Sequence, residues 1–411
     1  MAERAPLSRV SRAAHDVARR LIDAGYEAWF VGGAVRDGLY EELHRRSPPS
    51  TGPVDIATSA RPEQVRALFR RTVPVGIEHG TIAVLDDLGM LHEVTTFRRD
   101  VKTDGRHAVV EFGVSLDDDL ARRDFTINAI AVHPVNGELR DPSGGRDDLR
   151  AGIVRAVGVP ALRFIEDRLR VLRALRFASA FGFTIEPDTW AALVASSGDL
   201  DHLSRERVRD EWLKTLTTAV PSMAFGLWRR AGVLKRVWPE LAPLRDSAEQ
   251  WLDQVSPRTP VVLTAAALAH AGVSPRAAGD AARRLKFANK DIGMVEEVVE
   301  ALGSSRPEAG DAAGVRRWVA ARRGVAREAV GALPPSAPDA EAFRAAVGAV
   351  LRSQDALAIG DLAVTGDDLL AAGIPAGPAV GQALRSLLEL VLDNPALNTR
   401  EELLARLRVT K

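Results

Sequence analysis

Two acidic residues, Asp55 and Glu93, each interrupt a short apolar stretch of the sequence. Residues 54–57 and 91–97 have the composition of β-strands, so the two carboxylates could face one cleft if these strands are neighbours. Mg²⁺ prefers hard oxygen ligands, commonly one or two carboxylates together with phosphate and water. We therefore predict that Asp55 binds a metal ion and that both residues serve phosphate-transfer chemistry. The simpler alternatives are an Asp at a strand end and a solvated Glu on a strand.

A glycine pair, Gly32 and Gly33, separates a predicted strand over residues 27–31 from a predicted helix over residues 35–43. Glycines in such a turn let backbone N–H groups approach a phosphate closely, and the helix N-terminus favours an anion. Arg36 could add a bidentate contact to the same phosphate. A plain strand-to-helix turn is the alternative interpretation.

A third group of polar residues lies within seven positions: Arg122, Arg123, Asp124 and Asn128. Arginines can hold triphosphate oxygens, whereas Asp and Asn side chains can hydrogen-bond ribose hydroxyls. A charged helix start with Asp124 as its N-cap would explain the Asp but not the paired arginines.

The run 163–177 is typical of a helix, on which Asp167 and Arg170 would lie three positions apart on one face. A carboxylate beside a guanidinium offers one acceptor and one donor in fixed geometry. Cytosine and adenine each present an amino donor next to a ring-nitrogen acceptor, whereas guanine and uracil present the reverse order. The pair could therefore recognise C and A together. An ordinary salt bridge between positions i and i+3 is the alternative.

The elements that must position these residues change in character along the chain. Strands are predicted at 27–31, 54–57, 80–85, 91–97, 109–112 and 127–133, and helices at 8–25, 35–43 and 62–70. From about residue 161 onward the pattern is helical almost throughout. We therefore predict an α+β fold, with a mixed-sheet head followed by an all-helical remainder.

Composition narrows the class of protein. The 411 residues are 46% hydrophobic and 27% charged, as in soluble globular proteins, and they include no cysteine, which excludes disulfides and thiolate metal sites. An apolar run of membrane-spanning length and a signal-peptide core are both missing, so a cytoplasmic protein without membrane contact is expected. Lys plus Arg equals Asp plus Glu at 55 each, so any polyanion must bind through local patches.

Two basic clusters on predicted helices are candidates for such patches. One comprises Arg205, Arg207, Arg209 and Lys214, and the other includes Arg316 and Arg317 beside Trp318. We predict that both contact RNA. Solvated helix faces are the alternative.

Together these segments resemble the bacterial class II tRNA nucleotidyltransferases, the CCA-adding enzymes, and the related poly(A) polymerases. The matching motifs follow the family order: GGAVRD (32–37), VDIATSARPEQV (54–65), HGTIAV (79–84), EVTTFRRD (93–100), DGRH (104–107), RRDFTINAIA (122–131), DPSGGRDDL (141–149), RFIEDRLRVLRALRF (163–177) and SRERVRDEWLK (204–214). A weaker similarity continues in RRLKFANKD (283–291) and GDDLLAAGIPAGPAVGQAL (366–384).

The resemblance implies Mg²⁺-dependent addition of CMP and AMP, from CTP and ATP, to the 3′ end of tRNA, with further contacts at the tRNA elbow. It implies a polymerase β-like head over residues 1–160, a neck over 161–220, a body over 221–335 and a tRNA-binding tail over 336–411. By position, it assigns triphosphate binding to Gly32, Gly33 and Arg36, a metal carboxylate to Asp55, ribose and phosphate contacts to Arg122, Arg123, Asp124 and Asn128, and base recognition to Asp167 and Arg170 braced by Glu166.

The sequence departs from the family pattern at Pro53, which stands where the family has its first catalytic Asp. Proline offers no side-chain ligand to a metal, so impaired catalysis is one expectation. Residues 98–109 also resemble a shortened form of the family's flexible loop, which is associated with the switch from C to A addition. The alternatives are therefore a catalytically deficient RNA-binding protein, a poly(A) polymerase, and an enzyme that adds only CC or only A.

Overall fold

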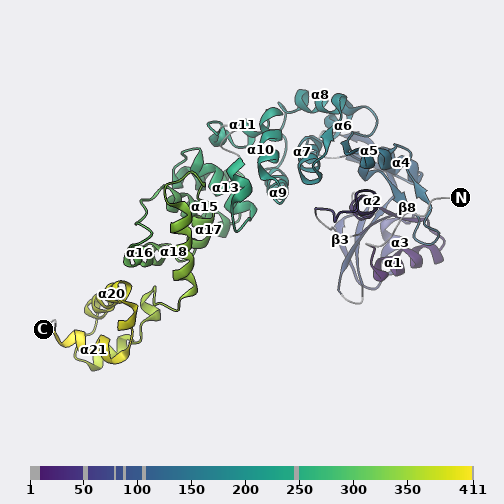
Figure 1. The fold of residues 1–411 in the computed structure, drawn as a ribbon. Helices are drawn as coiled ribbons and strands as arrows, with labels where there is room; N and C mark the ends of the chain where they lie inside the picture. Colours follow the sequence, from purple (N-terminus) through teal and green to yellow (C-terminus); the bar gives the residue numbers. More distant parts are fainter. Residues whose placement is uncertain are drawn as a thin grey trace. The chain divides into compact units, whose positions relative to one another are not determined.

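The computed structural model describes residues 10–49, 54–77, 80–86, 89–103, 108–244 and 250–409 (Figure 1). The chain divides into two compact units, Met1–Val237 and Trp238–Lys411. The first contains the strands, and the second is helical, so the predicted α+β class is confirmed. The division into head, neck, body and tail stays a prediction.

A seven-stranded mixed sheet forms the centre of the first unit, in the order β3-β4-β5-β2-β1-β8-β9. Its strands are β1 (Ala28–Val31), β2 (Asp55–Thr58), β3 (Thr72–Gly76), β4 (Thr81–Leu85), β5 (Leu91–Thr96), β8 (Ala131–Val132) and β9 (Leu139–Arg140). Only β2 and β5 pair in parallel among the strands of this sheet, all of which lie in the described residues. Alternate apolar residues such as Phe30, Ile56 and Val94 are buried, which fixes the register against the covering helices.

The remaining elements of the first unit surround this sheet or follow it. The helices are α1 (Arg12–Asp23), α2 (Gly33–His44), α3 (Pro62–Leu68), α4 (Leu116–Ala121), η2 (Thr126–Asn128), α5 (Gly145–Ala151), α6 (Pro160–Glu166), α7 (Leu169–Phe181), α8 (Pro187–Ser196), α9 (Arg205–Thr215), α10 (Pro221–Arg230) and α11 (Leu234–Val237). Two small sheets complete it, β6 (Arg98–Thr103) with β7 (Ala108–Phe112) and β10 (Ile153–Val154) with β11 (Thr184–Ile185).

Three sequence predictions about these elements were wrong in part. The strand predicted over 127–133 is limited to β8, because residues 126–128 form the 3₁₀ turn η2. The sequence analysis missed β3, whose Val73 and Val75 are exposed around Pro74 and so lack the pattern of a half-buried strand. The segment assigned to a flexible loop contains the paired strands β6 and β7, while residues 104–107 lie outside the described residues.

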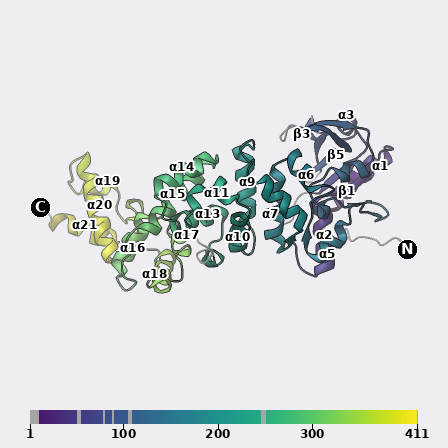
Figure 2. The same cartoon turned by 90° about the horizontal axis from the view of Figure 1, so that it is seen from above.

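The second unit is built from helices. They are η3 (Pro239–Leu241), η4 (Gln250–Gln254), α13 (Pro260–His270), α14 (Pro275–Arg284), α15 (Asn289–Gly303), α16 (Ala312–Ala321), α17 (Ala326–Gly331), α18 (Ala340–Arg352), η5 (Ile359–Asp361), α19 (Gly366–Ala371), α20 (Pro378–Asp393), η6 (Pro395–Leu397) and α21 (Arg400–Val409). One apolar cluster centres on Val319, Phe343 and Val347, and another on Val391 and Leu403. Helices α13 and α15 pack side by side (Figure 2). Among the described residues, none of the helices combines the length and the apolarity needed to span a bilayer.

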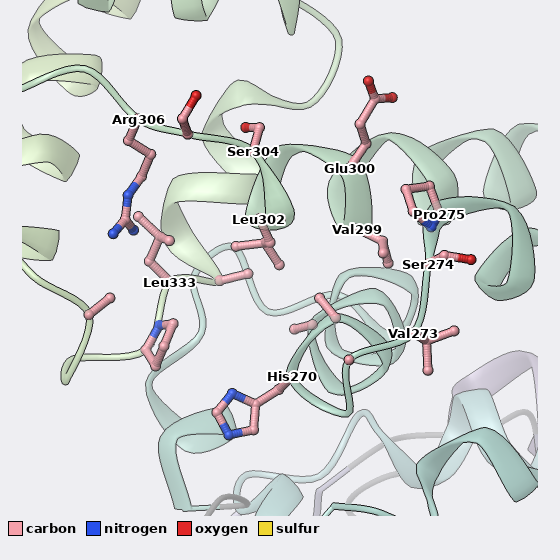
Figure 3. A pocket seen from close by; sticks show the side chains of 18 of the residues that line it. His270, Val273, Ser274, Pro275, Val299, Glu300, Leu302, Ser304, Arg306 and Leu333 are labelled. Atoms are coloured by element: carbon pink, nitrogen blue, oxygen red, sulfur yellow. The ribbon is translucent and has the colours of Figure 1, made fainter.

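A cavity of about 800 Å³ opens in the second unit beside α13, α15 and α17 (Figure 3). Its walls are mainly apolar, as at Val273, Val299 and Leu333, with His270 and Glu300 among the few ionisable side chains. The acidic and basic residues singled out from the head sequence all belong to the first unit, so this cavity is separate from the predicted chemistry.

Close backbone packing at Gly145 positions the turn η2. Helix α5 begins at Gly145, and Asp141 accepts hydrogen bonds from the backbone N–H groups of Gly145 (2.8 Å) and Arg146 (2.9 Å). A Cβ atom at residue 145 would collide with the backbone carbonyl of Thr126. The glycine therefore allows α5 to lie against η2, which carries Asn128.

We expect Gly145→Ala to lower the free energy of unfolding by about 1–3 kcal/mol, because overpacking against a backbone atom forces η2 to move. Urea unfolding followed by circular dichroism measures this change. Gly198→Ala is the matched control, since a Cβ there meets only a side-chain nitrogen of Arg236 at 3.5 Å, and it should change stability by less than about 0.5 kcal/mol. Equal stability of the two variants would contradict the packing argument.

Candidate active site

The carboxylates of Asp55 and Glu93 lie on adjacent strands. Strand β2 runs between β1 and β5, and the register pairs Asp55 with Val31 on one side and with Glu93 on the other. Parallel pairing in register places the two acids side by side on the same face of the sheet. Burial raises the pKa of Asp55 to about 6, and the negative charge of Glu93 adds to this effect against the opposing charge of Arg123.

Gly32 gives the Asp55 carboxylate its space. The residue has a positive φ of 69°, and a Cβ there would lie 2.6 Å from Asp55 Oδ2 and 3.5 Å from an Arg123 guanidinium nitrogen. The following residue, Gly33, begins α2, so the turn between β1 and α2 lies against Asp55. The predicted glycine turn and the predicted acid are thus brought together at one place.

Arg122 and Arg123 share a buried partner, Asp119, that the sequence analysis did not single out. Arg122 donates to Asp119 Oδ1 from Nε (3.0 Å) and from a terminal nitrogen (2.8 Å), and Arg123 donates to Oδ2 (3.2 Å). Burial works against ionisation of Asp119, yet Arg123 and Arg122 hold its pKa below the ordinary value. The spacing of three and four positions on α4 could have indicated these pairs.

Asp124 and Asn128 form a buried chain of hydrogen bonds with Arg36 and Arg173. Asp124 Oδ1 accepts from the Asn128 side-chain amide (3.0 Å) and from the Phe125 N–H (2.8 Å). Its Oδ2 accepts from Arg173 Nε (2.7 Å). Burial by itself would raise the pKa of Asp124. The charge of Arg173 and the hydrogen bond from Asn128 nevertheless keep this pKa well below the usual range. A ribose contact by Asp124 stays a prediction, and it would require one of these donors to move.

Arg36 is buried, and protein groups occupy its guanidinium. It donates to Asn128 Oδ1 (2.8 Å) and, from two nitrogens, to Asp37 Oδ1 (2.8 and 2.7 Å). Its planar group also lies over the rings of Phe177 and Phe181, about 5 Å from each centroid. Arg36 therefore braces α2, η2 and α7, and the contact with a phosphate stays a prediction.

Asp167 and Arg170 are near one another in the chain but do not share a helix, so that part of the prediction was wrong. Asp167 lies between α6 and α7 in extended conformation, with φ of −149°, and its Oδ1 accepts from the Leu169 N–H (3.0 Å). Its Oδ2 accepts from Arg207 on α9 (2.9 Å). The side chain thus ends one helix and caps the next, which explains the break.

Glu166 contacts Arg170, one of the two residues that it was expected to brace, and base recognition by Arg170 stays a prediction. Arg170 donates to Glu166 Oε2 (2.9 Å), to the Arg163 carbonyl (3.1 Å) and to the Arg122 carbonyl (2.9 Å). A guanidinium carries more N–H donors than these three bonds use. Arg170 therefore links α7 to the Arg122 backbone and retains N–H groups that can donate to a ligand.

The predicted RNA-contacting residues divide into two kinds. Arg205, Arg207, Arg209 and Lys214 do lie on one helix, α9, where Lys214 is exposed and Arg209 pairs with Asp210 (2.8 Å).

For Arg316 and Arg317 the structure contradicts a free basic face. Arg316 donates to the carbonyls of Leu392 and Asp393, and Arg317 pairs with Glu389 (2.9 Å) and Asp393 (2.7 Å). Both residues fasten α16 to the end of α20, where unsatisfied helix carbonyls attract cations.

Pro53 lies outside the described residues. Within the described part of the chain, acidic and histidine side chains form no group of three or more that could hold a metal. Asp55 and Glu93 thus stand as a pair. The partners Arg173 and Arg207 are 49 and 40 positions from the acids they contact, so no local spacing in the sequence points to them.

Three family models match the chain in succession. They describe a Poly A polymerase head domain at residues 28–155, a probable RNA and SrmB-binding site of polymerase A at residues 182–245, and a tRNA nucleotidyltransferase domain 2 at residues 261–407. The first of them spans the sheet with Asp55, Glu93 and the Arg122–Asn128 segment.

Individual proteins agree with these models. The CCA-adding enzyme of Lacticaseibacillus paracasei is 36% identical over 403 residues, which are 96% of this chain and 95% of that protein. The enzyme of Anoxybacillus flavithermus is 44% identical over 237 residues, 57% of each chain, so that alignment spans little more than half of the relative. The crystal structure of the Bacillus stearothermophilus CCA-adding enzyme in complex with CTP is 34% identical, with a TM-score of 0.79 over 97% of this chain and 98% of that one. This chain belongs to the family of the CCA-adding enzymes and poly(A) polymerases.

Proposed function

We propose that this protein adds the 3′-terminal CCA to tRNA, using CTP and ATP as substrates. The relative from Lacticaseibacillus paracasei, which matches over nearly the whole chain, is a CCA-adding enzyme. The carboxylate pair of Asp55 and Glu93 beside the Gly32–Gly33 turn is the observation that supports the proposal most directly. It combines acidic oxygens with a helix N-terminus, and nucleotidyl transfer needs both a cation and a triphosphate site.

The Asp55 and Glu93 pair fits a divalent cation such as Mg²⁺. Two carboxylates at adjacent strand positions offer hard oxygen ligands, and the pKa of Asp55 is raised first by burial and further by the negative charge of Glu93, both of which a bound cation would offset. A bound Mg²⁺ supplies positive charge against the phosphate oxygens in the transition state. The chain itself contributes the backbone N–H groups of Gly32 and Gly33 and the guanidinium groups of Arg122 and Arg123 as further phosphate contacts.

The residues that select the base lie at the junction between α6 and α7. Asp167 offers acceptor oxygens, and Arg170 offers donors held in place by Glu166 and the Arg122 carbonyl. Cytosine and adenine present the complementary donor and acceptor edge. Arg170 also touches the backbone of the segment proposed to hold the triphosphate, so base and phosphate contacts are mechanically linked.

The tRNA would contact α9 through exposed cations such as Lys214, and its elbow would contact the helices of the second unit. CTP, ATP and tRNA occur together in the cytoplasm, where we place the protein. Pro53 favours one competing function, a catalytically deficient RNA-binding protein, because the position lacks a carboxylate.

Incubation of the purified protein with Mg²⁺, labelled CTP and ATP, and tRNA lacking its 3′ end should yield tRNA extended by CCA. Long ATP-only tails would indicate a poly(A) polymerase, and products ending after CC or requiring CC would indicate a specialist. No incorporation with intact tRNA binding would establish the deficient RNA-binding protein instead.

Pro53→Asp should increase the rate of incorporation by about a hundredfold or more, since a further metal carboxylate stabilises transition-state charge by several kcal/mol. Pro53→Asn is the matched control, because it removes the proline and adds a side chain of the same size without charge. If both variants gain equally, the effect comes from the backbone and the proposed metal site is wrong.

Asp55→Asn should abolish most activity and yet stabilise the metal-free protein. Because the pKa of Asp55 is about 6 in the folded protein and 3.8 for an unperturbed Asp, the folded state binds more protons between these values. Stability of the wild type therefore falls as pH rises from about 4 to 6 and stays lower above that range. At pH 8 in EDTA we expect the variant to be more stable by about 1–3 kcal/mol, measured by urea unfolding.

The second part of this experiment measures the effect of Mg²⁺ on the unfolding temperature. Saturating Mg²⁺ should raise the unfolding temperature of the wild type and leave that of Asp55→Asn unchanged, because only the folded wild type binds the ion. Asp147→Asn serves as the control, since the Asp147 side chain is 83% exposed and should affect neither quantity. An equal response to Mg²⁺ in all three proteins would mean that the ion binds elsewhere.

A further inference from the structure

We propose that Arg207 is a specificity-determining positioning residue, which orients the Asp167 carboxylate for base recognition. The inference rests on the proposed function, because it assumes that Asp167 recognises the base. It also gives Arg207 a use other than the RNA contact expected from its place in a basic cluster.

Two donors from different elements fix the Asp167 carboxylate. The Leu169 N–H at the start of α7 donates to Oδ1 (3.0 Å), and the Arg207 guanidinium on α9 donates to Oδ2 (2.9 Å). Since each oxygen has one donor from the protein, the plane of the carboxylate is set and further lone pairs remain. Without Arg207, only Leu169 would restrain the group, and it could turn.

Helix α9 is a rigid support for this contact. It packs against α7, its Val208 and Trp212 are buried, and Ser204 caps its N-terminus. One turn beyond Arg207, the buried Glu211 pairs with Arg176 of α7 (2.8 Å). The two helices are therefore tied at a second point, and the guanidinium of Arg207 starts from a fixed backbone.

Asp167 pairs with a single cation, Arg207, and its remaining lone pairs can accept from a ligand. Its neighbour Glu166 is instead held between two cations, Arg163 (2.5 Å) and Arg170 (2.9 Å). An oriented carboxylate accepts from the amino group of cytosine or adenine and meets the carbonyl oxygen of uracil or guanine as a repulsive neighbour. The orientation of the Asp167 carboxylate therefore affects discrimination between bases more than it affects affinity for the triphosphate.

The ion pair contributes little to folding. The Arg207 and Asp167 side chains are 36% and 29% exposed, and pairs in this setting are worth about 0–1 kcal/mol of stability. Loss of Arg207 should therefore change base choice without unfolding the protein, and this separates a positioning role from a merely structural one.

The test compares Arg207→Ala, Arg207→Lys and the control Arg150→Ala, whose wild-type side chain is 54% exposed on α5 and pairs with the nearby Asp147 (2.5 Å). The kcat/KM values for CTP and UTP are measured with tRNA lacking its 3′ end, together with the Kd for tRNA and the unfolding temperature. For Arg207→Ala we expect the CTP-to-UTP ratio to fall by about tenfold to a hundredfold, the scale of a hydrogen bond to a charged group. Arg207→Lys should restore part of the ratio, and Arg150→Ala should keep it.

Affinity for tRNA should stay within about twofold in every variant. An unchanged CTP-to-UTP ratio overturns the inference, and if tRNA affinity falls at the same time, Arg207 is an RNA contact. If the wild type incorporates no nucleotide, the proposed function fails, and the ratio of the Kd values for CTP and UTP, measured by calorimetry, decides the role of Arg207 by itself. A ratio of Kd values unaffected by Arg207→Ala would then refute it.

Discussion

The parallel alignment of β2 with β5 puts Asp55 beside Glu93, and much of the polar structure of the first unit compensates for that juxtaposition. Burial of the Asp55 carboxylate, with repulsion from Glu93 as a smaller contribution, raises its pKa to about 6. Gly32 leaves space for the carboxylate, and Arg123 is the strongest opposing charge. The sheet thus holds a pair of neighbouring acids whose mutual repulsion a bound cation would relieve.

Helix α7 organises the charges around this pair. Three of its arginines occur at intervals of three residues, and each pairs with an acid from a different element: Arg170 with Glu166, Arg173 with Asp124 and Arg176 with Glu211. Burial of such cations is tolerable only when each has a close acidic partner. The helix therefore joins the end of α6, the segment before η2 and the helix α9 into one network with fixed geometry.

Strands and helices with a clear apolar pattern could be predicted from the sequence. Turns and helix breaks that a single polar side chain produces could not. The alternation in residues 80–97 gives β4 and β5 correctly. The turn η2 and the break before α7 are made by Asp124 and Asp167, whose carboxylates bond to nearby backbone N–H groups. An Asp before an apolar run is an N-cap signal that could have located the second break.

The residues of the candidate site could be identified in the sequence. The contacts between their side chains were predicted less well. Asp55, Glu93 and Gly32 are brought together as expected, because strand pairing and the glycine turn are local consequences of sequence. The partners Arg173 and Arg207 come from distant segments, and a single sequence does not record such pairs. Arg316 and Arg317 look like a basic surface in the sequence because the carbonyls at the end of α20 that they bind leave no trace in residue type.

The pairing of arginines with acids has a consequence for how nucleic acid would be held and released. The chain has no net charge, and Arg209 on α9 and Arg316 and Arg317 on α16 already have acidic or carbonyl partners. A phosphate that took one of these cations would replace an existing partner, so the counterion release that drives most RNA binding would contribute less. Binding through these cations would then depend weakly on ionic strength, and the displaced acids would compete to regain their partners. Such competition would favour release of a bound nucleic acid over tight retention.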